Sequence, residues 1–174
     1  MVISLRSLKR EGAIRFSVLL IGMAALFVVA GPVLVSRAVA DDAQTCKNAS
    51  GEVAIAACTR VIENRGTSTK NRAVSYNNRG FEYHAKGDND RAIADYTEAI
   101  RLNPAGAYVN RGNAYITKGD NDRAIGDYTE AIRLDPKDAV AYVNRGIAKR
   151  TKGDASGGDA DIATAKQLNP RIGN

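Results

Sequence analysis

The sequence predicts an all-α fold, a solenoid of antiparallel helical hairpins in which each hairpin stacks on the next. The first observation is duplication, since residues 86–104 and 118–136 are identical at 17 of 19 positions. The segments that precede them, 73–85 and 105–117, are also alike. The second observation is a Lys-Gly-Asp turn that divides each copy into two segments whose apolar residues have helical spacing. A single hairpin buries too little apolar surface to be stable alone, so each relies on its neighbours.

The repeat units follow from these similarities. Gly80 and Gly112 lie 32 residues apart, and Gly112 and Gly146 lie 34 residues apart. Residues 53–62 resemble the second helix of the later copies, with Cys58 in place of the aromatic residue. The expected organisation is a signal peptide at 1–40, a degenerate first repeat at 41–72, two regular repeats at 73–104 and 105–138, a degenerate repeat at 139–170 and a tail at 171–174.

The N-terminal segment has the layout of a secretory signal peptide. Residues 1–15 are basic and polar, residues 16–35 are almost continuously apolar, and Ala38-Val39-Ala40 supplies the small residues that signal peptidase reads. We expect cleavage after Ala40 and a periplasmic or secreted protein. The alternative is an uncleaved inner-membrane anchor, since about 20 apolar residues suffice to span a bilayer.

Charge does not indicate a nucleic-acid partner. The chain has 174 residues, of which 44% are hydrophobic and 25% charged, so it is too apolar for a disordered linker. Residues 1–40 hold five basic residues and one acid, whereas the remainder holds 20 basic and 18 acidic residues. That remainder has no run of Lys and Arg with interleaved aromatic residues, which excludes a phosphate-binding stripe.

Small residues mark where the two helices of a hairpin cross. Gly80 and Ala92 are small because a larger side chain at either position would push the helices apart. Tyrosines and aliphatic residues fill the space on either side. Gly in each Lys-Gly-Asp turn ends the first helix, and the Asp begins the second.

These positions resemble the signature of the tetratricopeptide repeat. The matching residues are Tyr76, Gly80, Tyr83, Ala92, Tyr96, Ala99 and Pro104, and then Tyr108, Gly112, Tyr115, Ala124, Tyr128, Ala131 and Pro136. The resemblance implies a right-handed α-solenoid that holds a partner protein or peptide in a concave groove. It implies no catalysis, and the sequence offers no nucleophile-base set, phosphate loop or metal cluster, so we expect no cofactor.

The resemblance also implies which residues face the groove. They are Val74, Asn77, Phe81, His84, Val109, Asn113, Ile116, Val143, Ile147 and Arg150. This groove is apolar and amide-rich, and it lacks the lysine-rich clamp with which chaperone-binding members hold a terminal carboxylate. For His84, the only histidine, a solvated surface position is the favoured alternative to ligand contact.

Two cysteines, Cys46 and Cys58, lie twelve residues apart on the two arms of the first hairpin. An even number of cysteines in an exported protein favours a disulfide. The alternative is two buried small apolar residues. Without a C-x-x-C spacing or a nearby histidine, we do not expect a redox pair.

An Asn-Arg-Gly tripeptide recurs in three repeats. A functional interpretation makes its arginines, Arg79, Arg111 and Arg145, a ladder of donors for a bound peptide. The structural interpretation, which recurrence in every repeat favours, pairs them with acids of the same or an adjacent hairpin and lets the asparagines link helices. The candidate acids are Asp95, Glu98, Asp127, Glu130 and Asp161.

The last repeat departs from the pattern. Lys149, Gly158 and Ile162 replace the inner Tyr, the Ala and the second aromatic residue. No further polar helix follows it, so we expect an apolar end face that could support self-association. A membrane-tethered assembly factor is the alternative function if residues 16–35 stay in the membrane.

Overall fold

The computed structural model describes residues 40–103 and 106–172. From Asp42 onward, the described residues belong to one compact unit. The predicted signal segment up to residue 39 lies outside the described residues. Within the described residues, no helix has the length and hydropathy needed to cross a membrane.

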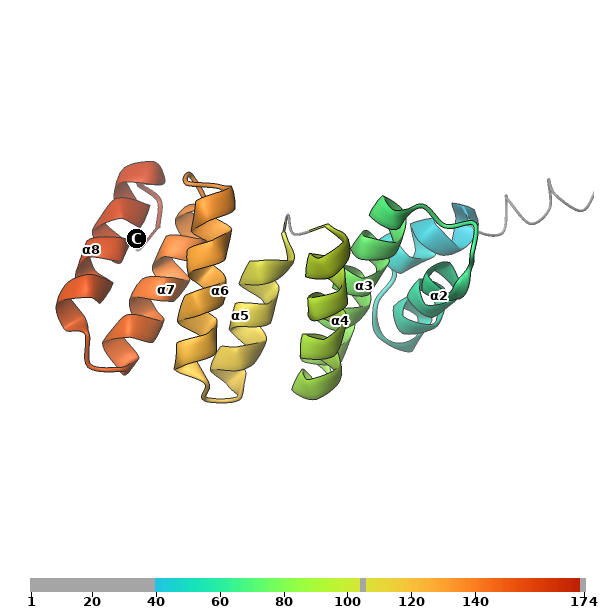
Figure 1. Cartoon of the computed structure of the whole chain (residues 1–174), viewed down its shortest axis with the longest axis horizontal. Coiled ribbons are helices and arrows are strands. Elements are labelled where there is room, and N and C mark those ends of the chain that lie inside the picture. Colours follow the sequence, from blue (N-terminus) through green and yellow to red (C-terminus); the bar gives the residue numbers. More distant parts are fainter. Residues whose placement is uncertain (1–39, 104–105, 173–174) are drawn as a thin grey trace, which may run out of the picture. The chain divides into compact units, whose positions relative to one another are not determined.

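Helices make up the unit. Residues 40–48 are helical, and α2 to α8 follow: α2 (Gly51–Glu63), α3 (Thr69–Ala85), α4 (Asn89–Leu102), α5 (Ala107–Thr117), α6 (Asn121–Leu134), α7 (Ala139–Thr151) and α8 (Ala155–Leu168). Each helix packs mainly against the helices before and after it, as Figure 1 shows. No strand occurs in the described parts of the chain. The prediction of an all-helical solenoid is confirmed.

The Lys-Gly-Asp turns have the geometry that the sequence predicts. Gly87 and Gly119 end the first helix of their hairpins with φ angles of +80° and +78°, which favour glycine. The next residue begins the second helix, since the carboxylates of Asp88 and Asp120 accept hydrogen bonds from the third residue of α4 and α6. Each turn therefore stops one helix and starts the next within three residues.

Close helix crossing accounts for the repeated glycines. A Cβ atom on Gly80 would lie 2.8 Å from the Tyr96 ring, and one on Gly112 would lie 2.6 Å from the Tyr128 ring. Both tyrosines are only 1% exposed. The rings therefore fill the space that the missing side chains leave, and neither partner of the contact tolerates enlargement.

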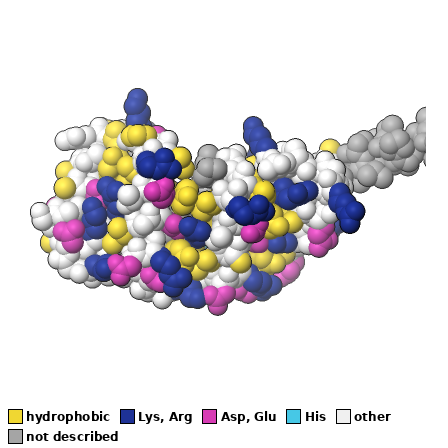
Figure 2. All heavy atoms as spheres, in the orientation of Figure 1, with side chains coloured by type: hydrophobic (Ala, Val, Ile, Leu, Met, Phe, Trp, Pro, Cys, Tyr) yellow, Lys and Arg dark blue, Asp and Glu magenta, His cyan; other side chains and the backbone are white. Residues whose placement is uncertain are grey.

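Charged side chains of both signs are mixed over the surface. Figure 2 shows Lys and Arg interspersed with Asp and Glu on the face in view, without a large area of one sign. In three hairpins the turn lysine pairs with an acid on the preceding hairpin; these pairs are Lys86–Glu52, Lys118–Asp90 and Lys152–Asp122. Such pairing is expected from the nearly equal numbers of basic and acidic residues after residue 40.

Candidate functional site

A cavity of about 390 Å³ opens among α3, α5, α6 and α7. Its lining residues are His84, Asn113, Ile116, Thr117, Tyr128, Asn144 and Ile147. We call it the central cavity. Four of the predicted groove residues lie together in it, and three of its lining residues, Thr117, Tyr128 and Asn144, were not in the predicted set.

Two amides and a phenol form the polar part of the central cavity. The Oδ1 atom of Asn113 accepts hydrogen bonds from the Tyr128 hydroxyl at 2.8 Å and from Asn144 Nδ2 at 3.0 Å. Burial raises the pKa of Tyr128, so its hydroxyl keeps the proton that it donates. Because Asn113 Oδ1 is occupied twice, the amide is oriented with its Nδ2 group as the remaining donor. Asn144 retains its Oδ1 atom as an acceptor.

Two isoleucines form the apolar part. Ile116 of α5 and Ile147 of α7 occupy successive hairpins, and both are exposed. Apolar side chains in a cavity with oriented polar groups are the usual composition of a ligand site. The central cavity therefore offers aliphatic contacts beside one amide donor and one amide acceptor.

His84 stands at the α3 side of this cavity. Its Nδ1 atom lies 2.7 Å from Oδ1 of Asn89, the first residue of α4. A bond to an amide oxygen places the proton on Nδ1 and leaves Nε2 as an acceptor in the neutral ring. The histidine is half-buried and lines the cavity, so ligand contact and a solvated surface position both stay open.

The other predicted groove residues lie outside the central cavity. Val74 and Phe81 are exposed on α3, and Val143 is half-buried on α7. Asn77 accepts a hydrogen bond from Asn110 at 3.0 Å. Arg150 forms an ion pair with Asp159 at 3.7 Å and is exposed.

Val109 is half-buried and is not among the residues that line the central cavity. It packs against the buried cluster around Tyr128 and lines a separate cavity of about 240 Å³ with Tyr108 and Leu134.

The asparagines of the Asn-Arg-Gly tripeptides link successive hairpins. Asn110 donates to Asn77, Asn144 donates to Asn113, and Asn78 Nδ2 donates to the Cys46 carbonyl at 3.4 Å. Each bond joins the first helix of one hairpin to the first helix of the hairpin before it. The interpretation that these asparagines link helices is confirmed.

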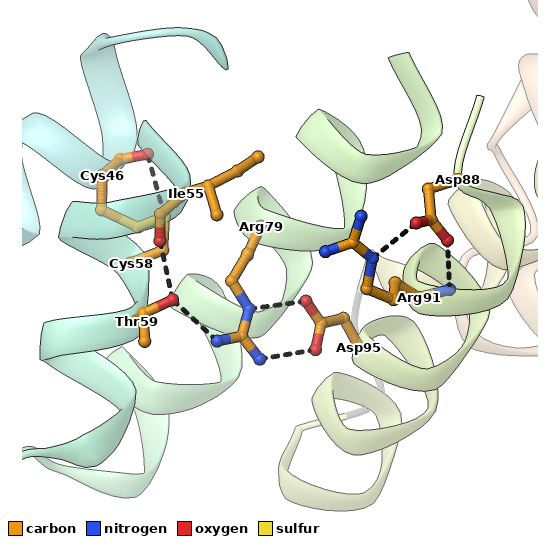
Figure 3. A network of polar contacts seen from close by, with 8 residues as sticks. All are labelled: Cys46, Ile55, Cys58, Thr59, Arg79, Asp88, Arg91 and Asp95. Atoms are coloured by element: carbon orange, nitrogen blue, oxygen red, sulfur yellow. Dashed lines mark hydrogen bonds and ion pairs between the residues drawn. A yellow bond between two sulfur atoms is a disulfide. The ribbon is translucent and has the colours of Figure 1, made fainter. Parts of the chain in front are cut away.

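The arginines of the same tripeptides are used within the array. In Figure 3, Arg79 Nε and Nη2 each donate to the carboxylate of Asp95 at 2.8 Å, and Nη1 donates to Thr59 Oγ1 at 2.9 Å. The same three bonds recur at Arg111 with Asp127 and Thr97, and at Arg145 with Asp161 and Thr129. The structural interpretation of these arginines is confirmed, since their donors already have partners.

Lys149 belongs to the same arrangement in the last hairpin. Its Nζ atom lies 2.9 Å from Oδ2 of Asp161, the carboxylate that also binds Arg145. Burial raises the pKa of Asp161, but the hydrogen bonds from Arg145 and Lys149 outweigh it and leave the pKa below its usual value.

The outer side of α8 carries charged residues as well as small and apolar ones. Asp159 and Lys166 stand where α4 and α6 carry isoleucines, and both are exposed. Ala163 replaces the threonine that accepts from the next arginine, and Ser156 replaces the acid that pairs with the next turn lysine. Leu168, near the end of α8, is 39% exposed, so an apolar end face and self-association through this hairpin stay a prediction.

The first hairpin contains the predicted disulfide. Cys46 and Cys58 are joined at an S–S distance of 2.10 Å. Both are buried and pack with Ala57. The bridge connects helical residues 40–48 to α2, which confirms the disulfide over the alternative of two free cysteines.

Fold and cavity together define an α-solenoid repeat protein with a hollow on the side of its first helices. Family models for the tetratricopeptide repeat match residues 73–105 and, as a TPR repeat, residues 112–153. The chain belongs to the tetratricopeptide-repeat family. No curated protein sequence matches it.

Solved structures of the same family are similar. The second TPR of Spaghetti (RPAP3) bound to the HSP90 peptide SRMEEVD is 31% identical, with a TM-score of 0.56, and the match covers 57% of this chain and 94% of that one. The second TPR domain of human RPAP3 in complex with the HSP70 peptide SGPTIEEVD is also 31% identical, with a TM-score of 0.58 and coverage of 62% and 89%. The Arabidopsis OM64 TPR domain is 28% identical, with a TM-score of 0.60 and coverage of 61% and 89%.

Proposed function

We propose that this chain is a non-catalytic interaction module that holds a partner protein or peptide in the groove containing the central cavity, outside the cytoplasm. Similar TPR domains bind peptides, which supports a peptide or protein partner here. The observation that carries the proposal is the double hydrogen bond to Asn113, which orients one amide donor and one amide acceptor at the cavity.

The occupant is an extended segment with uncharged, aliphatic side chains. A peptide unit offers one C=O acceptor and one N–H donor, which match Asn113 Nδ2 and Asn144 Oδ1. Ile116 and Ile147 lie beside them and favour aliphatic side chains. No lysine, arginine or acid is among the seven lining residues, whereas the peptides in the similar structures end in Glu-Glu-Val-Asp. We therefore do not propose recognition of an acidic C-terminus.

A set of seven-residue peptides with aliphatic, polar or acidic side chains tests this specificity by fluorescence anisotropy. The matched variants are Ile147→Ser and Val140→Ser. Both replace an exposed β-branched side chain of α7, with 52% of Ile147 and 54% of Val140 exposed. Only Ile147 lines the central cavity. Because an apolar contact of this size is worth about 1.5 kcal/mol or more, Ile147→Ser should weaken binding of aliphatic peptides roughly tenfold.

The Val140→Ser variant should bind like the unaltered protein. Preference for acidic peptides, or equal loss in both variants, would contradict the proposed groove and its chemistry. Circular dichroism of both variants checks that the helices remain, since both positions are on the surface.

We also propose that the chain is an exported bacterial protein. The basic, apolar and small-residue segments that end at Ala40 support a Sec-type signal, and a disulfide suits an oxidising compartment. The second candidate is an inner-membrane-tethered assembly factor, favoured by the length of the apolar segment at 16–35. N-terminal sequencing separates them, because a mature chain that starts at Asp41 has lost the segment that would form the anchor.

A further inference from the structure

The helical segment before α2 is attached to the array in an unusual way. Among the described residues 40–48, Cys46 is the one buried side chain, with 3% of its surface exposed. Residues 40–48 include no aromatic side chain to match Tyr96, which belongs to the apolar cluster that joins α4 to α5. Apolar packing therefore contributes little to holding it in place.

Two of the polar contacts that join this segment to later helices are weak. Asp42 pairs with Arg60 at 2.7 Å, but more than half of the arginine side chain is exposed, and exposed ion pairs contribute little. Asn78 donates to the Cys46 carbonyl at 3.4 Å, near the long limit for such a bond.

The disulfide joins this segment to a well-packed helix. Cys58 is fully buried in α2, and Ala57 beside it is fully buried as well. Together with Cys46 they form one cluster. If residues 42–48 leave, Ala57 and Cys58 lose their cover, and Asn78 loses its acceptor.

We propose that the Cys46–Cys58 disulfide is a redox-dependent latch: it holds residues 42–48 on the first hairpin, and reduction releases them while the later hairpins stay folded. In the reduction, a dithiol transfers two electrons and two protons to the bridge, giving two cysteine thiols, and closes to its own cyclic disulfide. The later hairpins keep their structure because each hairpin of a repeat array is held by contacts with its nearest neighbours. One such contact, the ion pair between Arg79 and Asp95, does not involve the disulfide and is not changed by reduction.

Hydrogen exchange followed by mass spectrometry on the full chain, before and after treatment with dithiothreitol, tests the latch. Amides of residues 42–48 should exchange on the order of 100-fold faster after reduction, the factor expected from losing a short covalent loop. Amides of α5 and α6 should be unchanged. Cys46→Ser should show the same pattern without reductant.

Asp42→Asn is the matched control, because it removes the ion pair and keeps the bridge; it should retain most of the protection. Iodoacetamide added after reduction should label both thiols rapidly. Protection of residues 42–48 that survives reduction, with slow labelling, would overturn the latch, as would loss of protection throughout α3 to α8. Neither hydrogen exchange nor thiol labelling measures peptide binding. These results therefore test the latch even if the chain does not bind peptides in the proposed groove.

Discussion

Arg111 and Asp127 face each other across one hairpin and are joined by two hydrogen bonds, of 2.9 Å from Nε and 2.8 Å from Nη2. Both side chains are largely buried. The third bond of Arg111, to Thr97, reaches the preceding hairpin. One arginine therefore joins the two helices of its own hairpin and also binds the last helix of the preceding hairpin, which makes it a connection between repeats as well as within one.

Asp127→Asn removes the charge from this pair and leaves the buried guanidinium with a weaker partner. We expect the free energy of unfolding to fall by about 3 kcal/mol, because breaking a buried pair uncovers an uncompensated charge. Urea denaturation followed by circular dichroism measures it.

Glu130→Gln on the same helix is the control. Its partner Arg133 lies 2.8 Å away, but both side chains are well exposed, so the expected loss is below about 0.5 kcal/mol. Equal losses in the two variants would show that burial of Asp127 does not matter.

Gly112→Ala and Gly126→Ala should have opposite effects on stability. A Cβ at Gly112 would lie 2.6 Å from Tyr128 Cε1, so we expect a loss of roughly 1–3 kcal/mol from overpacking. A Cβ at Gly126, an exposed helical position, meets nothing within 4 Å. Alanine there should stabilise by about 0.5–1 kcal/mol, since it favours the helix more than glycine does. Thermal unfolding of both variants gives the two signs, and a stabilised Gly112→Ala would refute the crossing contact.

Acid should weaken the last hairpin through Asp161. Its pKa is lowered in the folded chain, so the ionised carboxylate adds stability that is fully present above its unfolded pKa. That stability begins to be lost as the pH falls below the unfolded pKa of about 4, and the loss continues as the pH falls through the lower pKa of the folded chain. Asp161→Asn should be less stable near neutral pH and should lose less on acidification. Urea midpoints between pH 2 and pH 6 test this, and parallel curves for the two proteins would contradict the role of Asp161.

The fold was predictable because the repeats are nearly identical in sequence. A 17-of-19 match leaves little choice about which segments share a structure, and the Gly and Asp of each turn place the helix ends. The pairing of Asn-Arg-Gly arginines with acids was also predictable. The third hydrogen bond of these arginines, such as that from Arg111 to Thr97, was not predictable. In the sequence, Thr97 cannot be told from other surface residues of its helix, because its partner belongs to the next hairpin.

The candidate site was predictable only in part, because it depends on how deeply neighbouring hairpins pack. The family resemblance placed Val109 in the groove, and the residue is half-buried and lines a cavity other than the central one. Tyr128 was assigned to the interior from its signature position, although its hydroxyl reaches the central cavity.

Tyr128→Phe tests how the central cavity is organised. It deletes the hydroxyl that donates to Asn113 at 2.8 Å and leaves the ring that fills the space beside Gly112. We expect a loss of about 1 kcal/mol in the free energy of unfolding, the net value of one hydrogen bond. If Asn113 needs both bonds to keep its amide oriented, affinity for an uncharged aliphatic peptide should also fall several-fold. Isothermal titration calorimetry measures this affinity, and circular dichroism checks that the helix content is unchanged, as expected because the ring stays in place. Unchanged affinity would show that the hydrogen bond from Asn144 alone positions Asn113.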